Sequence, residues 1–274
     1  MSNNIILSAA VGYKFEQIEL FIKSLRKYYS DKICFIISKN DQILVDKLKT
    51  HRCDFILSDI SKKEIQFERY NIYLKYLKNK TFNQILLCDC RDIVFQGNPF
   101  NYNYKGSINF FLEDFKIKDC QHNRNWIVKT YGQKELESIS HKTILCSGTV
   151  LGNNKKITEY LKLICKNIST FKYKKKLKYL ITFRIDPESR GCDQGHANYI
   201  VHKSIIENVN LYSNSKGPVA TVFYLKKIKF DNNSKLINEI GEPYLIVHQY
   251  DKRWSEFSDA INYIKKQLGI RSFL

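Results

Sequence analysis

Residues 85–100 read ILLCDCRDIVFQGNPF, and this stretch decides how the rest of the chain is interpreted. Its first four residues are apolar and are followed by acids, a pattern that predicts a short buried strand. Asp89 and Asp92 come directly after that strand. Ligands of open α/β sheets bind beyond the carboxyl ends of the strands, so these carboxylates could hold one hard cation through oxygen. The spacing alone is common, and Asp92 could instead pair with Arg91 or cap a turn.

The segments before this stretch alternate between strand-like and helix-like patterns. Continuous apolar runs predict buried strands, which are residues 5–11, 33–38 and 54–57. Apolar residues at helical spacing, or a capping residue such as Asp41, predict helices, which are residues 15–29, 41–48 and 66–77. This alternation is typical of an α/β fold with a mostly parallel central sheet flanked by helices on both faces.

The second half of the chain is less regular. Strands are predicted at residues 108–112, 143–151 and 244–247, and helices at residues 157–168, 193–201 and 259–268. No linker rich in Pro, Gly or Ser and no internal repeat interrupts the chain. We therefore expect residues 1–274 to form a single domain.

Four short segments, in chain order, resemble the GT-A type of nucleotide-sugar glycosyltransferase. Residues 85–100 resemble the D-x-x-D variant of the metal-binding D-x-D region, matched at Asp89, Asp92, Ile93, Val94, Phe95, Asn98, Pro99 and Phe100. Arg91 departs from the commoner form, which has its second acid there. CSGTVLGN (146–153) resembles the strand that lines the sugar pocket, and CDQGHAN (192–198) the Asp-Gln element of retaining members. YLIVHQYDKRW (244–254) resembles the C-terminal strand whose histidine completes the metal site.

The resemblance implies a Rossmann-like GT-A domain, with a nucleotide-binding half at about residues 1–100 and an acceptor and sugar half at 101–274. It is greatest to retaining glycogenin-like enzymes and bacterial surface-polysaccharide transferases. Such enzymes move a sugar from a nucleotide-diphosphate donor, here a UDP-sugar by preference, to a glycan or lipid-linked saccharide. The resemblance places Mn²⁺ or Mg²⁺ on Asp89, Asp92 and His248, where a cation would stabilise the leaving diphosphate.

Other site residues follow from the same comparison and from the strand ends. Candidate catalytic residues are Asp193 and Gln194, with Glu113 or Asp114 as the general base if the enzyme inverts. Candidate nucleotide-binding residues are Ser8, Ala9, Ala10, Tyr13, Arg69, Asp89 and Arg91. Candidate sugar or acceptor contacts are Ser147, Gly148, Thr149, Asn198, Trp254 and Trp126. Structural roles are the alternatives for several of these residues. Asp193 could cap a helix, Arg69 could form a surface ion pair, and His248 and the two tryptophans could be core residues.

The chain carries a formal net charge of +18, yet only nine of its 45 basic residues are arginine. This lysine bias fits an AT-rich coding sequence, and the charge still favours anionic partners. The densest run of basic residues is Lys172–Lys178. It could form a solvated helix face, or it could make a peripheral contact with an anionic membrane. No signal peptide or membrane span is predicted, so we expect a cytoplasmic protein, peripheral at the inner membrane face if that run binds lipid. The eight cysteines form no C-x-x-C pair and are expected to be free thiols.

Three other functions compete with sugar transfer. A nucleic-acid-binding protein would explain the charge, but no recognised binding motif is present, so no nucleic-acid partner is expected. A metal-dependent nucleotidyltransferase would share the two acids but gives no reason for the Asp-Gln element or the C-terminal histidine. A non-catalytic member of the fold is left open by Arg91.

Overall fold

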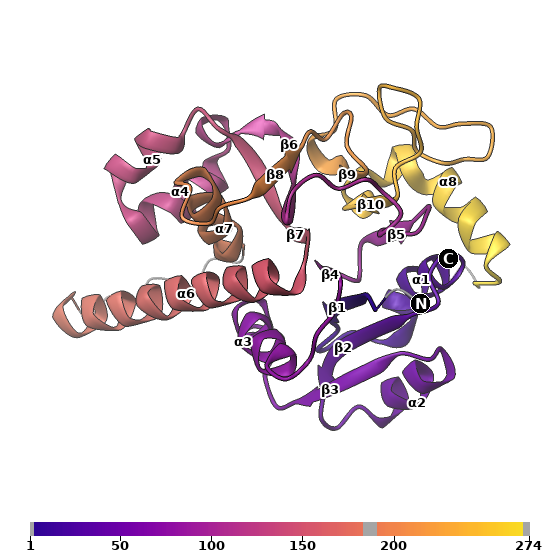
Figure 1. The fold of residues 1–274 in the computed structure, drawn as a ribbon, viewed down its shortest axis with the longest axis horizontal. Coiled ribbons are helices and arrows are strands. Elements are labelled where there is room, and N and C mark those ends of the chain that lie inside the picture. The colour runs from indigo at the N-terminus through magenta and orange to yellow at the C-terminus, as the bar shows by residue number, and fades with distance from the viewer. Residues whose placement is uncertain (1–2, 183–190, 271–274) are drawn as a thin grey trace.

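A seven-stranded sheet forms the centre of the molecule (Figure 1). The computed structural model describes residues 3–182 and 191–270, and for residues 173–182 it describes the helical backbone alone. The strand order is β3-β2-β1-β4-β7-β6-β8. The strands are β1 (Ile5–Ala9), β2 (Lys32–Ser38), β3 (Asp54–Ser58), β4 (Ile85–Cys88), β6 (Ile108–Lys116), β7 (Thr143–Gly152) and β8 (Val209–Tyr212).

Most neighbours in this sheet run parallel. β1 pairs in parallel with β2 and β4, β2 with β3, and β6 with β8. β7 is the exception, because it runs antiparallel to both β4 and β6. The mostly parallel α/β sheet predicted from the sequence is therefore confirmed.

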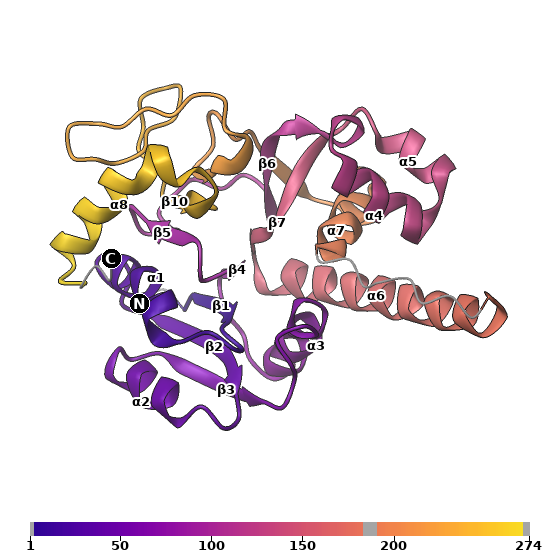
Figure 2. The same cartoon turned by 180° about the vertical axis from the view of Figure 1, so that it is seen from behind.

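Helices cover both faces of the sheet, as Figures 1 and 2 show. One face packs against α1 (Phe15–Arg26) and α2 (Gln42–Thr50), and the other against α3 (Ile65–Leu77), α6 (Asn154–Thr182) and α7 (Cys192–His202). Along β1 the side chains alternate between the two: Ile5 and Leu7 join the α3–α6–α7 core, whereas Ile6 joins the α1–α2 core. Asp41 caps α2 as expected, since its Oδ1 accepts a hydrogen bond from Leu44 N at 3.0 Å.

A second sheet of three short strands, in the order β5-β10-β9, was not predicted. Its strands are β5 (Ile93–Phe95), β9 (Val219–Thr221) and β10 (Ile246–His248). β10 runs antiparallel to β5, which sets His248 opposite Ile93. The strand predicted at 244–247 is thus shifted toward the C-terminus, because the pairing with β5 takes in His248. This sheet packs beneath α8 (Trp254–Gln267), whose Phe257 shares a core with residues of β5, β9 and β10.

Other differences concern the lengths and number of helices. The helix predicted at 157–168 is α6, which spans 29 residues and continues through the lysine-rich run. The remaining elements were not predicted: β8, α4 (Gln121–Tyr131), α5 (Gln133–Ile139) and the 3₁₀ turns Ile117–Asp119, Val222–Tyr224 and Tyr250–Arg253. The sequence shows weak periodicity there, and α4 and α5 pack on a small core of their own.

The run Lys172–Lys178 lies within α6, the helix that extends beyond the rest of the fold in Figure 1. Lys172 pairs with Glu68 of α3 at 2.6 Å, and the other side chains of the run lie outside the described residues. Within the part of the chain that the structure describes, no helix has both the length and the apolar character needed to cross a membrane.

Candidate metal and substrate site

One loop and a distant strand bring Asp89, Asp92 and His248 together. Asp89 follows β4, Asp92 precedes β5, and His248 ends β10. His248 Nε2 lies 3.5 Å from Asp89 Oδ2 and 3.7 Å from Asp92 Oδ1. One potential ligand atom from each residue lies within 4.8 Å of the other two. The β5–β10 pairing is therefore what carries the histidine to the acids.

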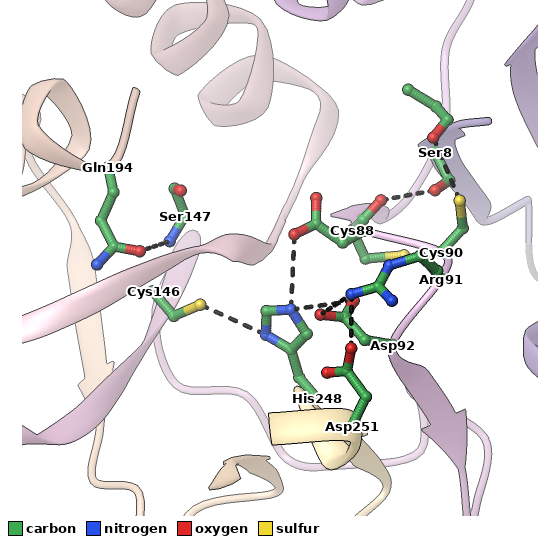
Figure 3. Close-up of polar contacts among 12 residues, drawn as sticks. Ser8, Cys88, Cys90, Arg91, Asp92, Cys146, Ser147, Gln194, His248 and Asp251 are labelled. Carbon is green, nitrogen blue, oxygen red and sulfur yellow. Dashed lines mark hydrogen bonds and ion pairs between the residues drawn. The ribbon is translucent and has the colours of Figure 1, made fainter. Parts of the chain in front are cut away.

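The His248 ring is held so that one nitrogen points at the acids (Figure 3). The side chain is 1% exposed, and Cys146 Sγ lies 3.4 Å from Nδ1 on the other edge of the ring. Nε2 is buried and makes no hydrogen bond in the described structure. Leaving such an atom without a partner is costly, and a cation between it and the carboxylates would satisfy it. Two carboxylates and one imidazole suit Mn²⁺, and to a lesser degree Mg²⁺, so these residues fit a divalent cation.

The two carboxylates differ in their electrostatic surroundings. Burial alone would raise the pKa of Asp89, but the Arg69 guanidinium and nearby His248 outweigh it and hold this pKa below its usual range. Burial raises the pKa of Asp92, and the neighbouring Asp89 carboxylate raises it further. Asp89 is thus the more strongly ionised of the pair, and a bound cation would favour ionisation of both.

Gly148 of β7 passes directly behind this cluster. A Cβ atom at this position would lie 2.4 Å from His248 Cε1 and 2.7 Å from Asp89 Oδ2. Both distances are far shorter than van der Waals contact, so any side chain would push the ligands apart. The carbonyl of Gly148 also accepts a hydrogen bond from Asp89 N at 3.0 Å. The glycine is therefore required by the closeness of β7 to the acids.

Arg69 of α3 connects the metal cluster to α7. Its two terminal nitrogens contact Asp89 Oδ1 at 2.6 Å and Asp193 Oδ2 at 2.8 Å. Tyr70 also donates a hydrogen bond to Asp193 Oδ2, at 2.8 Å. The Arg69 side chain is 13% exposed, so this is a largely buried network and not the surface ion pair considered from the sequence. Nor does Asp193 cap its helix, because the capping position is Gly191.

Gln194 lies beside Asp193 and reaches toward a second acid. Its side chain accepts a hydrogen bond from Ser147 N at 3.4 Å and donates to Glu113 Oε1 at 3.4 Å. Glu113 is 3% exposed, and burial raises its pKa to about 7. A carboxyl group with this pKa can exchange a proton at neutral pH. Asn198 supports Gln194 from below, since its Nδ2 donates to Gln194 O at 2.9 Å.

These groups face one cavity of about 460 Å³, lined by residues from both halves of the chain. The predicted residues that line it are Ala9, Tyr13, Arg69, Asp89, Arg91, Asp92, Glu113, Trp126, Ser147, Gly148, Asp193, Gln194 and His248. No family model matches this chain, and no curated protein matches it. What the chain does must therefore be inferred from the chemistry of this cavity. Its volume suits a small polar ligand, and its carboxylates, amide and guanidinium groups offer hydrogen bonds on several sides.

The predicted nucleotide residues separate into two groups. Ala9 and Tyr13 line the cavity, whereas Ser8 and Ala10 are fully buried and do not. Ser8 Oγ instead donates a hydrogen bond to Cys88 O at 2.7 Å, which ties β1 to β4 just before the acids. Alternation along β1 explains the difference, because adjacent side chains face opposite sides of the sheet.

Arg91 lines the cavity but does not take a ligand position. Its guanidinium contacts Asp251 at 2.6 Å and Asp92 at 3.9 Å (Figure 3). Asp251 belongs to the turn after β10, so the pair joins the acidic loop to the C-terminal segment. The charge of Arg91 is thus paired with an acid from elsewhere in the chain.

Four other predicted residues lie outside the cavity. Asp114 follows Glu113 on β6 and faces the other way, where its Oδ2 accepts a hydrogen bond from Lys226 N at 3.4 Å. Thr149 and Asn198 are fully buried, and Asn198 bonds the backbone of Leu145. Trp254 begins α8 and is 43% exposed, away from the cavity lining. For each of them, strand alternation or helix placement decides the direction of the side chain.

The structure also adds residues to the cavity that the sequence did not indicate. They include Lys62, His122, Asn123, Phe223, Tyr224 and Gln249. Each lies in a loop, a 3₁₀ turn or the unpredicted helix α4. No local pattern marks such positions, and only the position of Gln249, next to His248, could have drawn attention to it.

Proposed function

We propose that this chain is a metal-dependent glycosyltransferase that takes a sugar from a nucleotide diphosphate, UDP by preference. The acceptor in this proposal is a glycan or a lipid-linked saccharide. The observation that supports it is a single cavity in which the Asp89–Asp92–His248 cluster faces the Asp193–Gln194 pair. A metal cluster alone would serve many reactions. The second polar cluster beside it provides hydrogen-bonding groups for a sugar attached to the diphosphate.

The proposed role of each residue follows from its position in the cavity. Asp89, Asp92 and His248 would hold Mn²⁺ or Mg²⁺, which when bound would neutralise the charge that develops on the leaving diphosphate. Asp193 and Gln194 can bind sugar hydroxyls, and Arg69 keeps Asp89 and Asp193 in fixed relation. Holding a donor and an acceptor in a fixed orientation contributes much of the rate of such reactions.

The stereochemical outcome that we propose is retention, with Gln194 near the reacting face of the sugar. Glu113 is the observation that favours inversion, because it lines the cavity and its pKa of about 7 suits a general base. The anomeric configuration of the product, read by NMR, decides between the two. In an inverting enzyme Glu113→Gln should also abolish turnover, whereas in a retaining enzyme it should reduce turnover only moderately.

The decisive test is ligand-dependent stabilisation. UDP with Mn²⁺ should raise the melting temperature of the wild type, because a ligand that binds the native state stabilises it. Asp89→Ala and Asp92→Ala should lose this response, whereas Asp114→Ala, an acid on the same sheet outside the cavity, should keep it. An equal response in all four proteins would contradict the metal assignment.

Product analysis separates this proposal from its alternatives. A glycosyltransferase releases UDP from a UDP-sugar, whereas a nucleotidyltransferase releases pyrophosphate from a nucleoside triphosphate. Release of pyrophosphate alone would favour the nucleotidyltransferase. Binding of DNA or RNA that weakens with salt would revive the nucleic-acid alternative. Sedimentation with anionic vesicles tests the proposed peripheral contact of the Lys172–Lys178 run with an anionic membrane.

A further inference from the structure

Lys62 crosses the rim of the cavity beside the loop that follows β1. Its side chain lines the cavity, and its Nζ donates a hydrogen bond to Gly12 O at 3.2 Å. The ammonium also lies 4.5 Å from the centre of the Tyr13 ring, a cation–π distance. Gly12 allows this approach, because a Cβ atom there would lie 3.0 Å from Lys62 Cδ. The lysine therefore runs along the wall of the cavity, although it remains exposed to solvent.

The positively charged side chains that line this cavity differ in whether a carboxylate already pairs with them. Arg69 contacts Asp89 and Asp193, and Arg91 contacts Asp251. Among the described residues that line the cavity, Lys62 is the cation for which the structure shows no carboxylate partner. Cation–π and carbonyl contacts on an exposed lysine are weak, so its ammonium can change partners at small cost.

We propose that Lys62 is a phosphate-binding residue of the donor site, and that its ligand is the diphosphate of the nucleotide. This inference rests on the proposed function and adds a residue to it. A diphosphate bound at the Asp89–Asp92–His248 cluster lies beside several carboxylates, which repel it. It therefore needs a positively charged side chain that is not already paired with one of those carboxylates. An ammonium that moves from Tyr13 to the phosphates also uncovers the tyrosine ring, on which a base can stack.

The test compares Lys62→Ala with Lys62→Arg and with Lys63→Ala. Lys63 is the matched control, because it is the adjacent exposed lysine and does not line the cavity. Dissociation constants for UDP, pyrophosphate and uridine, each with Mn²⁺, are measured by calorimetry. Lys62→Ala should weaken UDP and pyrophosphate binding about ten- to a hundredfold, as expected for loss of one charge-assisted hydrogen bond. Lys62→Arg should stay within a few-fold of the wild type, and Lys63→Ala should be unchanged.

The three ligands separate the possible outcomes. Uridine carries no phosphate, so Lys62→Ala should leave its binding unchanged or make it tighter. If Lys62→Ala and Lys63→Ala bind UDP equally well, the inference about Lys62 is overturned while the donor proposal stands. The wild type could also bind pyrophosphate through Lys62 but bind UDP no more tightly than pyrophosphate. In that case the proposal of a nucleotide donor is wrong, and the assignment of a diphosphate site stands. Loss of uridine and UDP binding to the same extent would assign Lys62 to the base and overturn the inference.

Discussion

The N-terminal and C-terminal parts of the cavity are built in different ways. The acids and Arg69 come from a regular repeat of parallel strands and helices, in which β4 delivers Asp89 and α3 presents Arg69. Glu113 comes from β6, which is antiparallel to β7, whereas His248 comes from the small extra sheet and Gln194 from α7. Regular strands fix where a loop begins, whereas the C-terminal groups depend on pairings between distant segments. The first part therefore supplies two of the three candidate metal ligands, and the second supplies the third together with the polar groups beside it.

Removal of the first acid should have the largest effect. Asp89→Ala deletes a candidate ligand and also leaves Arg69 with one carboxylate partner instead of two. We expect sugar transfer, followed as UDP release, to fall at least about a hundredfold. The matched variant Asp114→Ala should keep turnover within about twofold, since surface-type substitutions away from the cavity have small effects. A large loss in Asp114→Ala instead would place the working acid on the other side of β6.

Removal of the C-terminal ligand tests the other part. His248→Ala should raise the Mn²⁺ concentration needed for half-maximal activity by at least about tenfold, because one of three ligand atoms is lost. The exposed His141 provides the control, and His141→Ala should leave the Mn²⁺ dependence unchanged. An unchanged Mn²⁺ dependence in His248→Ala would show that the acids bind the ion without the small sheet.

The buried acid of the C-terminal part should make stability depend on pH. The pKa of Glu113 is raised from 4.5 to about 7, so the folded state binds a proton more tightly than the unfolded state. Its favourable contribution is complete below pH 4.5 and is lost as the pH rises through about 7. Glu113→Gln removes this dependence, so its stability relative to the wild type should rise by about 3 kcal/mol between pH 4 and pH 8. Urea unfolding of both proteins at these pH values measures the difference, and parallel curves would contradict the burial of the charge.

The glycine where the two parts meet should be sensitive to a single methyl group. Gly148→Ala places a Cβ atom against His248 and Asp89, which must then move apart. We expect a loss of about 1–3 kcal/mol in the free energy of unfolding, as for overpacking in a core, together with weaker Mn²⁺ binding. Thermal unfolding with and without Mn²⁺ reports both effects. A fully stable variant with normal Mn²⁺ binding would mean that β7 lies farther from the cluster.

The smallest expected effect concerns the acceptor. Trp126 lines the cavity and stacks with His122, whereas Trp254 lies outside it. Trp126→Ala should raise the KM for the acceptor severalfold through lost aromatic contact, and Trp254→Ala should not change it. Initial rates at saturating donor, measured over a range of acceptor concentrations, give the KM of each variant. A larger increase in Trp254→Ala than in Trp126→Ala would place the acceptor beside α8.

Much of the N-terminal part could be predicted from local patterns. The apolar runs at β1, β2 and β4 are continuous because those strands are buried on both faces. β2 and β4 end where their runs end, whereas β1 ends at Ala9, two residues before the end of its predicted run. The acids at the end of β4 were found for the same reason. The three-residue strands β5 and β9 were missed, because so short a segment holds too little pattern to be recognised, and β10 was predicted two residues too early, at 244–247.

The sequence by itself determined the alternation of strands and helices, the mostly parallel sheet and the acids that end its fourth strand. These are local properties, because the pattern of apolar and polar residues within a short segment indicates both burial and periodicity. Only the tertiary structure decided that His248 reaches those acids, that Arg69 is shared between Asp89 and Asp193, and that Asp114 turns away. Such contacts join residues far apart in the chain, and their geometry depends on strand register and on the side of the sheet that each side chain takes.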